Sequence, residues 1–167
     1  YKNPVCGAEG HNLIFIDGKG QDFGSEYGGE IVEYEQSDAQ DKIVIDMTGA
    51  YPPGLAERVT RTLLFLKQEE HLILVDEVEC KNGTEVETRL HVGGKLTIEE
   101  GMARISTSKA SVIIVPSNPE QVTLKIGIHE GLELRGEGAT VQCEYLRALT
   151  KTQGGKGKIA LVITPYR

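Results

Sequence analysis

Tryptophan is absent from this chain of 167 residues, and aromatic residues make up only 5% of it. The core must therefore be aliphatic, and an aromatic platform broad enough to stack a row of bases is excluded. No apolar run approaches the roughly 20 residues of a membrane-spanning helix, so we expect no membrane span. Lys and Arg number 18 against 25 Asp and Glu, which gives a net charge of −7. Bulk charge will not hold such an acidic chain on phosphate backbones, so we expect no nucleic-acid partner.

Cysteine is also scarce. The three cysteines are Cys6, Cys80 and Cys143, and their spacing matches neither a CxxC metal motif nor a disulfide scaffold. We therefore expect idle or buried thiols. The first residues, Tyr1–Pro4, have neither the basic nor the apolar region of a signal peptide, and there is no initiator Met. We expect a mature chain, or one excised from a longer protein.

The residues that are abundant favour β-structure. Val, Ile and Thr together number 39 against 9 Ala, and 20 Gly and 6 Pro supply turns. Short apolar runs recur between these turn residues, as antiparallel strands do. They are Leu13–Ile16, Ile31–Tyr34, Ile43–Met47, Leu72–Val78, Val112–Val115, Val122–Ile128 and Ile159–Ile163. This pattern predicts an all-β fold over residues 1–167, a single antiparallel β-sandwich domain with short strands and little helix.

The clearest strand is Thr84–Val92, in which apolar and polar residues alternate. One face carries Val and Leu, and the other carries Glu, Arg and His, so we expect one buried and one solvent-exposed face. An Asn-Gly turn precedes the strand at Asn82-Gly83. Such turns join hairpins, so we expect Leu72–Cys80 to pair with Thr84–Val92. A further short strand is expected at Lys95–Ile98.

Two segments leave more room for interpretation. Residues 53–70 fit a helical period and a strand period; the β-branched Val-Thr-Arg-Thr run favours a strand, with a helical turn possible near Leu55. Gln153–Gly157 reads as a hairpin loop rather than a domain boundary, because an apolar strand follows it.

No complete catalytic or metal motif is visible from residue patterns alone. The four histidines form no HxH or HExxH pattern, and no GxSxG elbow occurs. His11 lies in a Gly-His-Asn turn, where a surface role is the ordinary interpretation. The alternating glutamates fit a solvated strand face better than an acid–base pair. Tyr27, Tyr34 and Tyr51 cluster in the first third, and Tyr27, Tyr51, His71 and His91 are the residues to search if the chain has activity of its own.

Four segments of the first half resemble the heparinase II/III-like polysaccharide lyases. Residues 10–21 (GHNLIFIDGKGQ) are similar to that family's HN-T-hydrophobic-x-ID-G-x-x-Q signature. Residues 46–51 (DMTGAY) match its D-x-T-x-A-Y segment, and residues 58–66 (RVTRTLLFL) resemble its R-x-hydrophobic strand. Residues 72–78 (LILVDEV) resemble its hydrophobic-V-D-x-hydrophobic strand, with Leu90-His91 like the LH that follows. The match covers Gly10 to about Gly94; beyond that, the chain resembles the family only in being β-rich.

The resemblance implies an architecture and a reaction. Family members have an N-terminal (α/α) toroid followed by a supersandwich-like β-domain, with an acidic polysaccharide bound between them. They cleave by β-elimination: a base removes the C5 proton of a uronate whose carboxylate is neutralised, and the C4–O bond breaks. Zinc-containing members hold the metal with an earlier His, an Asp and the His of the HN motif. Of these ligands only the last has a counterpart here, His11, so zinc is expected only in a full-length protein and its site in this chain is incomplete.

We therefore expect the C-terminal β-sandwich portion of such a lyase, without the toroid, supporting the substrate cleft. No catalytic residue is assigned to it, and the isolated chain is expected to be inactive. Its partners are expected to be the toroid of the same protein and an acidic glycan, such as a glycosaminoglycan or alginate. The resemblance also implies a periplasmic or secreted protein. The alternatives are a non-catalytic carbohydrate-binding or scaffolding module and a structural β-domain that matches by coincidence.

Overall fold

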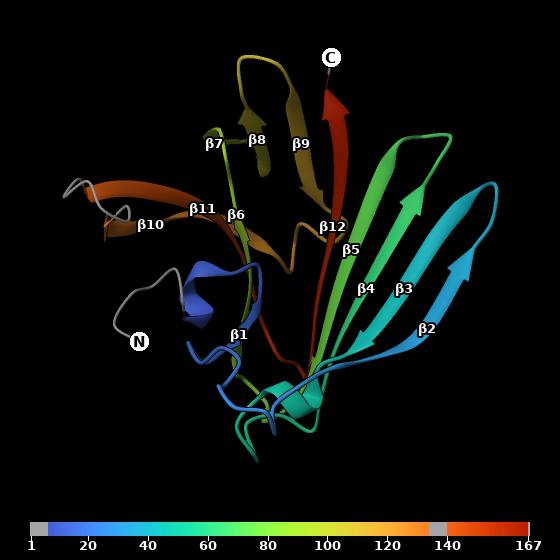
Figure 1. The fold of residues 1–167 in the computed structure, drawn as a ribbon, viewed down its shortest axis with the longest axis vertical. Coiled ribbons are helices and arrows are strands. Elements are labelled where there is room, and N and C mark those ends of the chain that lie inside the picture. Colours follow the sequence, from blue (N-terminus) through green and yellow to red (C-terminus); the bar gives the residue numbers. More distant parts are fainter. Residues whose placement is uncertain (1–6, 134–139, 167) are drawn as a thin grey trace.

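The computed structural model describes residues 7–133 and 140–166 and consists of two antiparallel β-sheets (Figure 1). Within these residues the helical elements are two short 3-10 turns, η2 (Ala8–Gly10) and η3 (Thr48–Ala50). None of the helices in the described part of the chain has the length and hydrophobicity needed to cross a membrane. The expected all-β antiparallel sandwich is confirmed.

The smaller sheet has four strands in the order β1-β6-β11-β10. The larger has eight strands in the order β2-β3-β4-β5-β12-β9-β8-β7. The strand bounds are β1 Ile14–Ile16, β2 Glu30–Gln36, β3 Gln40–Asp46, β4 Arg58–Leu66, β5 His71–Glu79, β6 Glu85–His91, β7 Lys95–Glu99, β8 Met102–Ser106, β9 Ser111–Pro116, β10 Thr123–Glu133, β11 Thr140–Lys151 and β12 Lys156–Tyr166.

Every apolar run in the sequence overlaps a strand. The ambiguous segment 53–70 contains β4, so its strand interpretation is confirmed. Leu55 lies in a turn before this strand, where its backbone N–H donates to the Pro52 carbonyl. The strands β10 and β12 have 11 residues each and extend well beyond their apolar runs, and β11, with 12 residues, was not among the predicted strands. Their polar residues continue the alternation, because only every second side chain faces the other sheet.

The strand pairing shows that one predicted hairpin is wrong. β5 pairs with β4 and β12 in the large sheet, while β6 pairs with β1 and β11 in the small one, so the two strands are not hairpin partners. Gly83, with a φ of 80°, instead turns the chain from one sheet to the other. The predicted hairpin loop at Gln153–Gly157 is closed by an antiparallel bridge between Gln153 and Lys156, and the strands that it joins, β11 and β12, belong to different sheets. A turn motif predicts that the chain reverses, but not that the flanking strands share a ladder.

The core lies between the inner faces of the two sheets. Thr88 of β6 donates a hydrogen bond to Asp76 of β5, which fixes which faces of these strands meet. Around this contact the core is almost entirely aliphatic, as the lack of Trp required. Its buried members include Ile14, Ile16, Val59, Val78, Val86, Leu146, Ala148, Ile159 and Leu161.

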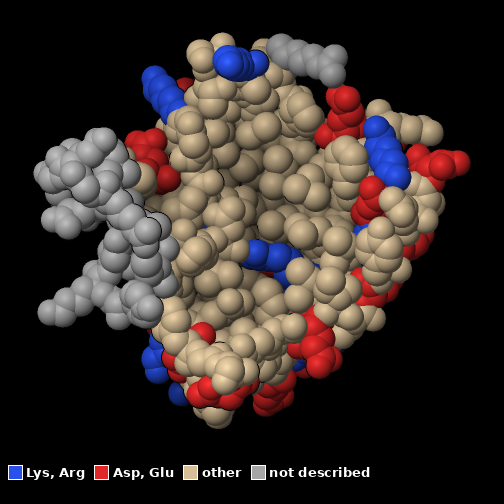
Figure 2. Space-filling model, viewed as in Figure 1, with Lys and Arg blue, Asp and Glu red and all other residues tan. Residues whose placement is uncertain are grey.

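The inner face of the large sheet extends beyond the area that the small sheet covers. Cross-strand pairing places Ile31, Tyr34 and Phe65 on this face, yet their exposed fractions are 66%, 62% and 39%. Figure 1 shows the reason: the two sheets are close at the end where the turns gather and diverge toward the opposite end. In the same view the space between the sheets is hollowed and mostly uncharged, with charged side chains around its rim (Figure 2).

Candidate functional site

Several polar residues of the family-like segments form buried hydrogen bonds, some within the large sheet and some from it to the small sheet. Arg61 of β4 donates through Nε and Nη2 to the two carboxylate oxygens of Asp76, at 2.7 and 2.8 Å. Asp76 is completely buried and also accepts from Thr88. Burial by itself lowers the pKa of Arg61, but the hydrogen bonds and charge of Asp76 outweigh it and raise that pKa. This bidentate pair is a scaffold that links the neighbouring strands β4 and β5 of the large sheet, and the hydrogen bond from Thr88 of β6 connects it to the small sheet.

The DMTGAY segment has a similar structural role. Asp46 accepts hydrogen bonds from the Thr48 hydroxyl at 2.6 Å and from its backbone N–H at 2.9 Å, and these bonds lower the pKa of Asp46. The Thr48 hydroxyl in turn accepts from the Val59 N–H at 2.9 Å. The Tyr51 hydroxyl donates to the Ile14 carbonyl at 2.8 Å, and burial raises the pKa of this phenol. Tyr51 therefore lies in the core rather than at a reactive surface.

Asn12 connects this scaffold to a histidine array on the far side of the small sheet. Its backbone carbonyl accepts a 2.6 Å hydrogen bond from Nη1 of Arg61. Its side-chain Oδ1 accepts from the His91 backbone N–H at 2.7 Å and lies 3.1 Å from Nδ1 of the same residue. A backbone N–H can only donate, so the Asn12 atom that receives it must be the oxygen.

His91 and His129 form an imidazole pair on the outer face of the small sheet. Their Nε2 atoms lie 3.1 Å apart, and the ring planes differ by only 2°. The ring centroids are 5.3 Å apart, and the two facing nitrogens are 3.1 Å apart. The difference is about two ring radii, so the facing nitrogens lie on the line between the centroids and the rings meet edge to edge. The contact is thus an N–H···N hydrogen bond between coplanar rings.

Tyr145 of β11 packs against both imidazole rings. Its centroid lies 5.2 Å from that of His91 and 4.5 Å from that of His129, with interplanar angles of 22° and 20°. The opposing residue on β10 is Gly127, where an added Cβ would lie only 2.3 Å from the Tyr145 ring. Glycine at this position leaves room for the ring, and the ring supports the imidazole pair.

The environment of His91 favours its uncharged form. Burial lowers the pKa of His91, and the neighbouring His129, Arg89 and His11 lower it further, while a hydrogen bond to the Glu9 carbonyl acts in the opposite direction. An uncharged imidazole has one donor and one acceptor nitrogen, so each contact of the array has a defined direction.

The same outer face carries an arginine cluster. Glu87 accepts from Nε of Arg89 at 2.6 Å and from Nε and Nη2 of Arg147 at 2.8 and 2.7 Å. The Arg89 guanidinium lies 3.6 Å from the centre of the Phe15 ring. Burial by itself raises the pKa of Glu87, but the hydrogen bonds from Arg147 and Arg89 outweigh it and lower that pKa.

The predicted solvent-exposed face of Thr84–Val92 is therefore wrong at Glu87. Only 2% of this residue is exposed, because it lies beside Phe15 of the neighbouring strand β1 and is paired with the side chains of Arg89 and Arg147. The alternation of polar residues was read correctly as a separate face. It could not show that Arg147 of β11, together with Arg89 of the same strand, would close over the carboxylate.

His11 lies next to Asn12 in an exposed turn, where its backbone N–H donates to the Ala8 carbonyl. Among residues 7–133 and 140–166, no group of three His, Cys, Asp or Glu side chains is placed to hold a metal ion. The neighbouring His91 already has both ring nitrogens engaged. The described residues therefore do not fit a zinc site by themselves, and His11 remains a predicted ligand whose partners would have to lie elsewhere.

The other candidates are dispersed. Tyr27 and Tyr51 border one cavity, whereas Tyr34 is on β2, and His71 begins β5 at the end where the sheets diverge. Cys80 and Cys143 are free, and Cys6 lies outside the described residues. Sequence reasoning missed His129 and Tyr145. Neither belongs to a motif, and only the β10–β11 pairing brings them beside His91.

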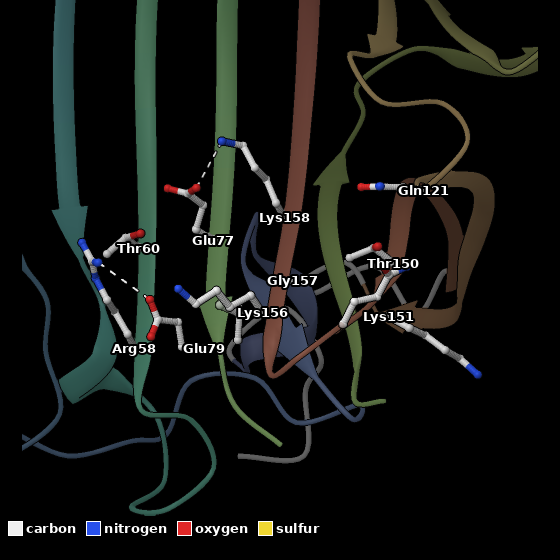
Figure 3. Close-up of a pocket in the computed structure, with 12 residues that line it drawn as sticks. Arg58, Thr60, Glu77, Glu79, Gln121, Thr150, Lys151, Lys156, Gly157 and Lys158 are labelled. Atoms are coloured by element: carbon white, nitrogen blue, oxygen red, sulfur yellow. Dashed lines mark hydrogen bonds and ion pairs between the residues drawn. The ribbon is translucent and has the colours of Figure 1, made fainter. Parts of the chain in front are cut away.

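A cavity of about 350 Å³ lies at the other side of the large sheet, where β4, β5 and β12 meet the end of β11 (Figure 3). Its basic side chains are partly neutralised: Lys158 pairs with Glu77 at 3.1 Å, and Arg58 lies 4.0 Å from Glu79. In Figure 3 Lys151 points away from the cavity. No aromatic side chain lines it, so the histidine array is the stronger candidate for a glycan site.

Comparison with known proteins identifies the family. The model of the heparinase II/III-like C-terminal family matches residues 6–159. A heparan sulfate lyase, HepC from Pedobacter heparinus, has a similar structure with a TM-score of 0.73 and 10% identity, covering 93% of this chain and 24% of that one. A heparinase III structure gives a TM-score of 0.73 and 14% identity, covering 93% and 23%. The chain thus spans about a quarter of these proteins' length.

A search of curated proteins gave no match. At such low identities the structural neighbours establish the fold, and the family assignment comes from the sequence match, which extends over most of the chain and well beyond the four segments noted above. The chain belongs to the heparinase II/III-like family and corresponds to its C-terminal domain.

Proposed function

We propose that this chain is the β-sandwich domain of a lyase that cleaves uronate-containing polysaccharides by β-elimination, and that the outer face of its small sheet forms part of the substrate cleft. Family membership supports the reaction class. The observation that carries the location is the ordered array of His91, His129 and Tyr145 beside Arg89 and Arg147.

The charge of this face suits an acidic glycan. Four cations, Arg89, Arg147, Lys125 and Lys151, lie on the same face as two carboxylates, Glu85 and Glu87, although the chain as a whole is acidic. In β-elimination the uronate carboxylate must be neutralised before the C5 proton becomes acidic enough to leave. Cationic side chains fixed in place by hydrogen bonds provide such stabilisation without reorganising. We assign this chain the support of the cleft and leave the base to another part of the protein.

The uncovered inner face of the large sheet supports the presence of a covering partner. Large apolar patches on soluble proteins mark interaction surfaces, and Ile31, Tyr34 and Phe65 form such a surface at the rim of the core. We propose that another segment of the same protein, preceding this domain as the family's toroid does, packs here or nearby. We further propose a periplasmic or secreted location, where acidic polysaccharides are accessible.

The function is tested with the full-length protein and three purified glycans: heparan sulfate, an unsulfated glucuronate polymer and alginate. The ultraviolet absorbance of the unsaturated product should rise with at least one of them. Arg147→Ala should lower kcat/KM, whereas Lys109→Ala, in the exposed turn before β9, should not. Absence of product with all three glycans, combined with retained glycan binding, would favour the non-catalytic carbohydrate-binding alternative.

A further inference from the structure

The hydrogen-bond partners of the histidine array determine where its protons lie. Asn12 Oδ1, which faces Nδ1 of His91, is an acceptor, and so is the Glu9 carbonyl that His91 also contacts, so we assign the hydrogen of this ring to Nδ1. In the uncharged ring, Nε2 of His91 is then a lone-pair acceptor. The facing Nε2 of His129 must therefore be the donor of the 3.1 Å contact.

The array ends at Nδ1 of His129. In the uncharged ring this atom carries the remaining lone pair. Among the described residues no hydrogen bond to it is formed, and it is not one of the buried unpaired atoms of the molecule. A polarised acceptor is thus left free on the face that also carries Arg89 and Arg147.

We propose that Nδ1 of His129 accepts a hydrogen bond from a hydroxyl group of the glycan, and that Asn12 fixes this acceptor through His91. The inference rests on the proposed function and adds the contact residue and its polarity. Arginines can bind the anionic groups of an acidic sugar but cannot accept hydrogen bonds. His129 supplies the acceptor that the sugar hydroxyls require. His91 and Asn12 are positioning residues, because they act only through His129.

The protonation pattern is tested directly in the 167-residue chain labelled with ¹⁵N-histidine. Long-range proton–nitrogen NMR spectra at neutral pH should show the hydrogen of His91 on Nδ1 and that of His129 on Nε2. Asn12→Ala removes the acceptor that fixes this pattern, so the His91 signals should shift toward the other tautomer. A wild-type spectrum with the hydrogen of His91 on Nε2 overturns the inference, whatever the enzyme does.

The glycan contact is tested in the full-length protein with two matched variants. The side chain of His129→Gln ends near the position of Nε2 and keeps the contact with His91, but it lacks an acceptor at Nδ1. The shorter His129→Asn places an amide oxygen near Nδ1 and loses the His91 contact. Loss of one uncharged hydrogen bond should raise KM roughly tenfold in His129→Gln with little change in kcat. His129→Asn should remain within about threefold of wild type.

The possible outcomes separate this inference from the proposed function. Equal KM values for wild type and His129→Gln in an active enzyme overturn the inference alone. An inactive wild type that also binds no uronate glycan overturns both. A sulfated and an unsulfated substrate should show the same KM increase, because the contact is made to a hydroxyl; an increase confined to the sulfated substrate overturns the assignment and points to an anion contact.

Discussion

The backbone carbonyl of Asn12 accepts a 2.6 Å hydrogen bond from Arg61, and the side chain of the same residue holds His91. Asn12 thereby joins the buried Arg61–Asp76 pair to the histidine array on the opposite side of the small sheet. The scaffold between the sheets and the candidate glycan site are parts of one hydrogen-bonded structure. Substitutions of the scaffold residues should therefore change the geometry of the histidine array.

Removing the carboxylate of Asp76 should be among the most destabilising single changes. Asp76→Ala leaves the guanidinium of Arg61, a residue that is only 8% exposed, without its partner and also deprives Thr88 of its acceptor. We expect a loss of about 3–5 kcal/mol in the free energy of unfolding, measured by urea denaturation. The matched control is Glu77→Ala on the same strand, whose exposed pair with Lys158 should contribute less than about 1 kcal/mol. Equal losses for the two variants would contradict the scaffold role.

Gly127 should be intolerant of even one added carbon. In Gly127→Ala the new Cβ would lie 2.3 Å from the Tyr145 ring, so the ring must move away from the imidazole pair. We expect about 1–3 kcal/mol of destabilisation from the overpacking, together with changed His91 and His129 NMR signals. Gly93→Ala is the control, since nothing lies within 4 Å of its Cβ and its φ is not positive. Unchanged imidazole signals in Gly127→Ala would show that Tyr145 does not support the pair.

Most strands were predictable because alternation and turn residues are local properties; β8 and β11, which contain none of the apolar runs, were missed. Even the ambiguous β4 follows from its β-branched residues. The distribution of strands between sheets was not predictable from the turns, as the corrected β5–β6 pairing shows. A ladder partner can lie anywhere in the chain: β6 pairs with β11, about sixty residues further on, rather than with the strand before it.

The candidate site was only half visible for the same reason. His91 and Asn12 stand in segments that could be recognised in sequence, whereas His129, Tyr145 and Arg147 become neighbours only through pairing of distant strands. The motif polar residues Arg61, Asp76 and Tyr51 could have been mistaken for reactive groups. Their burial and saturated hydrogen bonds identify them as structural.

The stability of the domain should depend on the protonation of His91. The folded state lowers the pKa of His91, so the unfolded chain binds the proton more tightly. The contribution of His91 to the free energy of unfolding is therefore complete above the ordinary histidine pKa of about 6.5. It is lost as the pH falls from there through the lower pKa of His91 in the folded state. Unfolding free energies measured between neutral and mildly acidic pH should therefore decrease, and less steeply in His91→Gln. The same slope in both proteins would exclude His91 as its source.

His11 is predicted to bind zinc only together with ligands outside the described residues. In the full-length protein, His11→Ala removes one of three protein ligands, so zinc content measured by mass spectrometry should fall sharply. Thermal stability should fall with it, because metal binding that joins separate segments contributes to folding. In the 167-residue chain the same change should alter zinc binding little. Full zinc occupancy in the full-length His11→Ala variant would show that His11 is a turn residue that binds no metal.

The uncovered inner face of the large sheet should make the 167-residue chain self-associate. Ile31, Tyr34 and Phe65 expose apolar surface that a partner segment would otherwise bury. The double variant Ile31→Thr, Phe65→Thr has a residue that favours strands at both positions but lowers the hydrophobicity of this face. It should bind less of a hydrophobic dye and sediment as a smaller species than wild type. Val115→Thr is the matched control, because Val115 is 36% exposed on the opposite face of the same sheet. A monomeric wild type with no dye binding, or an equal effect of the Val115 change, would mean that this face needs no partner.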